Sequence, residues 1–128
     1  MTAQVQIIDR ELERLDGLWE DGLSDAYRSY LEKLGRFGES SRHQLALAAA
    51  LIEVGIRLQG LGGRAAPAPT LLMGDLCLAR ASRLLADAAP QNVQVALAHA
   101  IEQMSSAAAS GHPTAPAREL LLGAFRAE

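Results

Sequence analysis

The sequence is poor in cysteine, in aromatic residues and in positive charge. Cys77 is the single cysteine among 128 residues, which excludes an internal disulfide and a metal site built from several thiolates. Aromatic residues make up only 4% of the chain, and the β-branched and aromatic runs typical of strands are missing. The net charge of −3 and the lack of a basic run argue against a nucleic-acid partner and an anionic membrane surface, since both need a basic face.

Long hydrophobic runs are also missing. The longest apolar stretch, Leu45–Leu58, is interrupted by Glu53 and Arg57, whereas a membrane helix needs about 20 predominantly apolar residues. The first residues become polar and acidic too soon for a signal peptide. We therefore expect a cytoplasmic protein without a membrane span, in which the lone thiol of Cys77 fills space in the core.

Alanine and leucine supply most of the 49% hydrophobic content, and both favour helix over strand. The sequence predicts one all-α domain, a bundle of five to six helices, with an N-terminal helical segment (1–39), core helices (40–110) and a C-terminal helix (111–128). The first expected helix is Val5–Tyr30, which Gly17 and Gly22 weaken and Gly35 ends, and the second runs from a cap at Ser40 or Ser41 to about Gln59. The third covers Leu71–Ala88 after a cap at Thr70, and the fourth covers Gln91–Ala109 after Pro90. A short last helix follows Thr114 and Pro116.

The second expected helix is apolar nearly all round, so we expect it to lie between its neighbours. Together with the third and fourth helices, it carries more apolar surface than a chain of this size easily buries. Contiguous apolar surface of that kind usually marks a protein–protein interface. The sequence therefore indicates oligomerisation.

Carboxylates four residues apart are the main candidates for chemistry. Asp21 and Asp25 share one helix face, where they could hold a magnesium ion, but a solvated helix start explains them more simply. His43, His99 and His112 lie on separate elements without metal-ligand spacing. We expect no catalytic residue, no metal site and no cofactor in this chain.

The segment Leu71–Leu85, with Gly74-Asp75 followed by Leu76, Leu78, Ala79 and Ala81, resembles the GD-x-x-L-A-x-A helix of trans-polyprenyl diphosphate synthases. Three further segments resemble that family in the same order: Leu47–Val54, Ala68-Pro69-Thr70 in the place of its R-P-T, and Ile101–Ser105.

The departures from that family are specific. Gly62-Gly63-Arg64-Ala65 stands where its first D-D-x-x-D motif is expected, and a second aspartate-rich motif does not occur. Because those carboxylates hold the Mg²⁺ that assists ionisation of the diphosphate, the resemblance implies a chain without activity of its own. It implies a noncatalytic small subunit of a heteromeric synthase of the hexaprenyl or heptaprenyl type, with Mg²⁺ bound only by its catalytic large subunit.

In that family the GD helix and the helix after it form the subunit interface, and the small subunit helps to shape the tunnel for the growing product chain. The resemblance therefore implies six interface residues: Leu72, Leu76, Ala79, Arg83, Leu97 and Ile101. The alternative function is a homodimeric helical bundle, an interaction module unrelated to prenyl chemistry.

Overall fold

Five α-helices, and no strand, make up the part of the chain that the structure describes, a computed structural model covering residues 17, 22–35, 37–58, 68–113 and 115–126. The all-α prediction is confirmed. Residues 5–16 and 18–21 of the long N-terminal helix expected from the sequence lie outside the described residues. The helices are α2 (Ser24–Lys33), α3 (Glu39–Leu58), α4 (Ala68–Ala88), α5 (Gln91–Ser110) and α6 (Ala117–Phe125).

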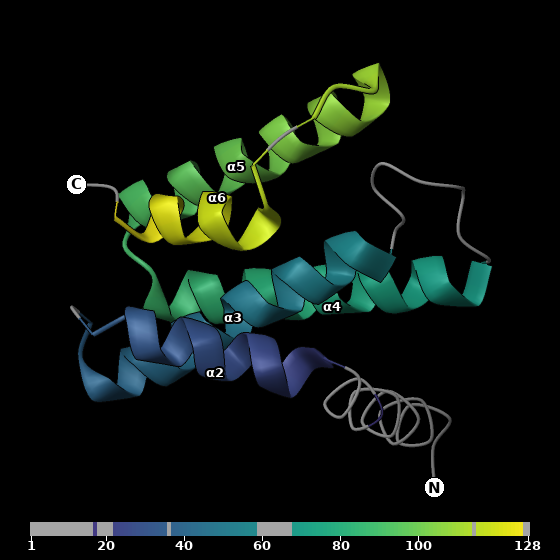
Figure 1. Cartoon of the computed structure of the whole chain (residues 1–128). Helices are drawn as coiled ribbons and strands as arrows, with labels where there is room; N and C mark the ends of the chain where they lie inside the picture. Colours follow the sequence, from purple (N-terminus) through teal and green to yellow (C-terminus); the bar gives the residue numbers. More distant parts are fainter. Residues whose placement is uncertain (1–16, 18–21, 36, 59–67, 114, 127–128) are drawn as a thin grey trace, which may run out of the picture.

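Helix α3 is the centre of the fold. Helix α4 packs along it, α2 packs on one side, and α6 lies between α3 and α5 on the other (Figure 1). Ten of its residues are buried, five of them alanine or glycine, as expected from its apolar sequence. Small residues let neighbouring helices approach closely, while each buried leucine or isoleucine contributes roughly 1.5–3 kcal/mol. Two of the aromatic residues, Tyr30 and Phe125, are among the largest fully buried side chains.

Proline and glycine set the ends of α5. Pro90, in an extended conformation, precedes its first turn, as Pro116 does for α6. At the other end Gly111 adopts a left-handed φ of 70°. Its N–H donates to the carbonyl of Ala108 (3.2 Å) and that of His112 donates to the carbonyl of Ala107 (2.9 Å), which is a Schellman motif. The limits predicted for this helix are confirmed to within one residue.

The predicted starts of two helices are wrong. Helix α3 begins at Glu39, so Ser40 and Ser41 lie inside its first turn, and the N–H of Arg42 donates to the carbonyl of Gly38 at 2.8 Å. Helix α4 begins at Ala68, which places Thr70 within it. Here Pro69 occupies the first turn, where its fixed φ suits a helix and its missing N–H costs nothing.

Gly22, one of two glycines expected to weaken the N-terminal helix, lies just before α2, and the residues before it are outside the described ranges. Its φ of +117° is outside the right-handed helical region, and α2 begins two residues later at Ser24. The guanidinium of Arg57 lies close by, because a β-carbon added to Gly22 would be 3.1 Å from its Nη1. The backbone conformation therefore favours glycine at this position.

Among the described residues, no helix is both long enough and apolar enough to cross a membrane.

Candidate functional site

Helix α4 has one face against α3 and an opposite face in solvent. The inner face consists of four buried residues at helical spacing: Gly74, Cys77, Ala81 and Leu85. The outer face carries apolar and charged side chains together, which distinguishes it from an ordinary solvated helix surface. We use the name outer face for five of the exposed or half-buried residues on this side: Leu72, Asp75, Leu76, Ala79 and Arg83.

The inner face is held unusually close to α3 by glycine. A β-carbon added to Gly55 would lie 3.1 Å from the carbonyl oxygen of Gly74, 3.1 Å from Cγ of Leu78 and 3.2 Å from Cβ of Cys77. Such distances are shorter than ordinary carbon contacts, so the two backbones meet where α3 has no side chain. The glycine of the Gly74-Asp75 pair thus lies at the contact between α3 and α4, which fixes how α4 is rotated.

That rotation exposes the outer face. Leu72 is 62% exposed, one of the few large hydrophobic side chains that are exposed among the described residues. Ala79 and Arg83 are exposed as well, and Leu76 is half-buried. Four of the six predicted interface residues therefore lie together on one accessible surface.

The two predicted interface residues on α5 are placed differently. Leu97 is 1% exposed and packs in the core of the chain, so its side chain is not accessible to a partner. Ile101 is half-buried against the same core. Only Ile101 is left as a contact from α5, because the face of α5 that carries these two residues is occupied by the chain's own core.

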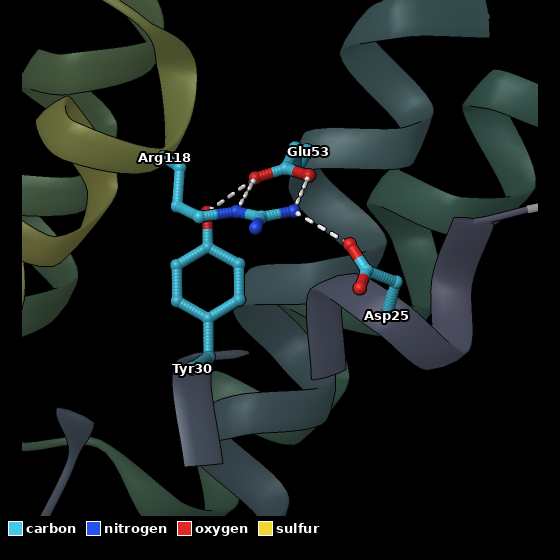
Figure 2. Close-up of polar contacts among 4 residues, drawn as sticks. All are labelled: Asp25, Tyr30, Glu53 and Arg118. Atoms are coloured by element: carbon cyan, nitrogen blue, oxygen red, sulfur yellow. Dashed lines mark hydrogen bonds and ion pairs between the residues drawn. The ribbon is translucent and has the colours of Figure 1, made fainter. Parts of the chain in front are cut away.

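A polar cluster joins three helices on another part of the molecule (Figure 2). Arg118 of α6 donates two hydrogen bonds to Glu53 of α3, from Nε to Oε1 at 2.9 Å and from Nη2 to Oε2 at 2.8 Å. The hydroxyl of Tyr30, on α2, donates to Oε1 of the same carboxylate at 2.9 Å. The guanidinium also lies 5.8 Å from the centre of the Tyr30 ring and 3.7 Å from the carboxylate of Asp25.

The charges in this cluster stabilise one another. Burial raises the pKa of Glu53, but the hydrogen bonds from Arg118 and Tyr30 and the charges of Arg118 and Arg57 lower it more, so it stays below the usual range. The pKa of Arg118 is raised, chiefly by its hydrogen bonds to Glu53. Burial and the neighbouring carboxylate raise the pKa of Tyr30, which therefore remains a neutral donor. A fully satisfied network of this kind fixes geometry.

The polar cluster was not identified from the sequence, although one signal for it was present. Glu53 interrupts the apolar run of α3, and a carboxylate in a central helix needs a partner because burying an unpaired charge is costly. The identity of that partner could not be read from the sequence, because Arg118 follows 65 residues later on α6.

The aspartates and histidines considered as metal ligands do not lie together in the structure. Asp25 is exposed in the first turn of α2 beside Arg118, and Asp21 lies outside the described residues. His43 is hydrogen-bonded through Nδ1 to the hydroxyl of Tyr27 at 2.6 Å, while His99 and His112 are exposed on other elements. Within the described ranges, no three histidine, cysteine, aspartate or glutamate side chains are arranged to hold a metal ion.

Cys77 has the environment of a core residue. Its side chain is fully buried between α3 and α4, and burial raises the pKa of the thiol to about 11. A thiol that remains protonated in a closed core is a poor nucleophile, since the thiolate is the reactive form. The expectation that Cys77 fills space in the core is confirmed.

Comparison of the chain with protein-family models, with curated proteins and with solved structures found no match.

Proposed function

We propose that this chain is a noncatalytic helical subunit that binds a catalytic polyprenyl diphosphate synthase subunit through the outer face of α4. In the complex the catalytic subunit supplies the aspartate-rich motifs and Mg²⁺. This chain supplies an apolar helix surface at the interface and part of the wall of the product tunnel.

The observation that carries the proposal is the exposure of Leu72, Leu76, Ala79 and Arg83 on one side of a helix whose other side is buried. These are the α4 residues that the resemblance to trans-polyprenyl diphosphate synthases assigns to a subunit contact. An exposed leucine at 62% accessibility costs solvation free energy that a partner recovers on binding.

Close contacts between the helices support the same function. Gly55 and Gly74 set the contact between α3 and α4, and Arg118 ties α6 to α3. A preformed helix face loses little conformational entropy on binding, which favours a stable complex. Such a face suits a subunit that presents a surface to a partner.

The proposal is tested by mixing the purified chain with candidate catalytic subunits that carry two aspartate-rich motifs. We expect no turnover of allylic and homoallylic diphosphates by the chain alone, and turnover when both subunits and Mg²⁺ are present. Substantial turnover by the chain alone would overturn the proposal, as would assembly with none of the candidates.

Two matched substitutions locate the interface. Leu72→Asp puts a charge on the outer face of α4 and should weaken assembly by about tenfold or more. Val95→Asp makes the same type of change at a residue of α5 that is 50% exposed, two positions before Leu97 and so on the opposite side of that helix. It should leave assembly unchanged. Equal effects of the two substitutions would place the interface elsewhere.

A further inference from the structure

We propose that α5 and α6 open together from the rest of the chain, with α6 as a strap that holds α5 in place and the Ala89-Pro90 junction as the hinge. The outer face of α4 and the contact between Gly55 and Gly74 take no part in this movement. The inference therefore goes beyond the proposed function and does not depend on it.

Helix α5 is held to the fold mainly by α6. It lies beside α6 and contacts that helix more extensively than any other (Figure 1). By contrast, α2, α3 and α4, which we call the body, are joined by extensive contacts of their own. The buried residues of α5 share one face, at spacings of four, three and four: Val93, Leu97, Ala100 and Met104. Displacement of α6 would therefore leave α5 without most of its cover.

Helix α6 depends in turn on both of its neighbours. It has nine residues, and an isolated helix shorter than about 12 residues is marginal in water. Only Glu119 and Gly123 among the nine are exposed, so α6 is covered on most of its circumference. Because α5 needs α6 for its cover and α6 needs α5 and α3 to remain helical, the two should leave the body as one cooperative unit.

The strap is anchored to the body near both of its ends. In its first turn, Arg118 donates to Glu53 at 2.9 and 2.8 Å. In its last turn, the ring of Phe125 meets that of Phe37 edge to face, with 6.2 Å between their centres. The Arg118 side chain is 34% exposed, so water is already present beside the ion pair. Opening hydrates both of its charges and leaves neither of them buried without a partner.

The junction between α4 and α5 permits the movement. The N–H of Ala89 donates back to the carbonyl of Leu85 at 2.9 Å, and the carbonyl of Pro90 accepts from the N–H groups of Val93 and Gln94 at 3.1 Å. These bonds belong to α4 on one side and to α5 on the other, and Pro90 has no N–H to donate. Nε2 of Gln94 donates to the carbonyl of Ala89 at 2.9 Å, which steadies the closed position. Rotation of the backbone at this junction turns α5 against α4 while both helices stay intact.

Hydrogen exchange of the full chain, followed by mass spectrometry, tests the opening. The slowest amides of α5 and α6 should share one opening constant, about tenfold or more larger than that of α3 and α4. A single constant for all helices would overturn the proposal. So would an α5 that stays protected while α6 exchanges, because the two helices would then not open as a unit.

Substitutions in the strap and in the body assign the opening. Arg118→Met leaves Glu53 unpaired only while the strap is closed, so the opening constant of α5 and α6 should rise by about tenfold or more. Phe37→Leu weakens the other anchor without changing α6 and should raise the same constant by about threefold. Gly55→Ala disturbs a contact that persists in the open state, so it should speed exchange in α3 and α4 and leave α5 and α6 unchanged. Equal acceleration of all helices by Gly55→Ala contradicts a separate opening.

Thiol labelling gives an independent measurement. Ala100 of α5 and Ala124 of α6 are both 7% exposed, and each can be replaced singly by cysteine in a chain that carries Cys77→Ala. Relative to their rates in urea, Ala100→Cys and Ala124→Cys should react equally fast, and about tenfold or more faster than Cys77 of wild type. The reason is that Cys77 stays between α3 and α4 when the strap opens. Introduced thiols that react as slowly as Cys77, or at clearly different rates from one another, overturn the proposal.

Discussion

Two glycine-to-alanine substitutions in helices of this chain should change stability in opposite directions. Gly55 and Gly123 both lie within helices, α3 and α6, and neither has a positive φ. In an exposed helix this change stabilises by up to about 1 kcal/mol, because glycine loses more backbone entropy on folding. The surroundings of the two residues decide whether that gain survives.

The geometry predicts the sign at each position. A β-carbon on Gly123 meets nothing within 4 Å, so Gly123→Ala should stabilise by about 0.5 kcal/mol, a reduced gain because the residue is near the end of α6. At Gly55 the added carbon lies 3.1 Å from a backbone oxygen and 3.2 Å from the Cβ of Cys77, neither of which moves without moving α4. Overpacking of this kind costs about 1–3 kcal/mol. The net effect of Gly55→Ala should be a loss of about 1 kcal/mol.

Urea unfolding followed by circular dichroism at 222 nm measures both values, and the difference between the two variants should be about 1.5 kcal/mol. Thermal midpoints should differ accordingly by about 6 °C, at about 4 °C per kcal/mol for a domain of this size. A Gly55→Ala variant as stable as Gly123→Ala would refute the close contact between α3 and α4.

Three further predictions concern the polar cluster and the thiol. Arg118→Met should lower the free energy of unfolding in urea by about 2 kcal/mol, because Glu53 loses the cation that pairs with it. The loss stays below that of a fully buried ion pair because 34% of the Arg118 side chain is exposed. Because the folded pKa of Glu53 is lowered from 4.5, its contribution is present above about pH 4.5 and is lost as the pH falls through the folded value. Unfolding measured between pH 3 and 7 should show this loss in wild type, and Glu53→Gln should lack that part of it. Cys77, with a thiol pKa of about 11, should react with a disulfide reagent at pH 8 far more slowly in the native chain than in urea, and equal rates would contradict its burial.

The periodicity of apolar residues predicted the helices well, because helix formation and one-sided burial depend on residues near one another in sequence. The central position of α3 followed from its apolar circumference, and the limits of α5 followed from Pro90 and Gly111. The starts of α3 and α4 were wrong because serine and threonine were taken as caps. Helix α3 begins at Glu39, directly after Gly38, and α4 begins at Ala68 with Pro69 in its first turn.

Contacts between distant segments were the part that the sequence could not supply. The rotation of α4 about its axis decides that Leu72 is exposed, and this rotation depends on the meeting of Gly55 with Gly74. The burial of Leu97 depends likewise on the packing of α5 against the chain's own core. Apolar spacing alone marks such residues as buried without saying whether the same chain or a partner covers them.

The pairing of Glu53 with Arg118 also has a consequence for the order of events during synthesis. The ribosome completes α3 long before it adds residue 118, so the growing chain carries an ionised, hydrated carboxylate on the surface that α6 later covers. We expect that charge to oppose association of the incomplete helices through this surface, because burying it unpaired is costly. When α6 emerges, Arg118 pairs with the carboxylate, and Leu121 and Leu122 of the same helix become buried. Glu53 is thus expected to oppose association of the unfinished chain, and it joins α3 to α6 in the folded one.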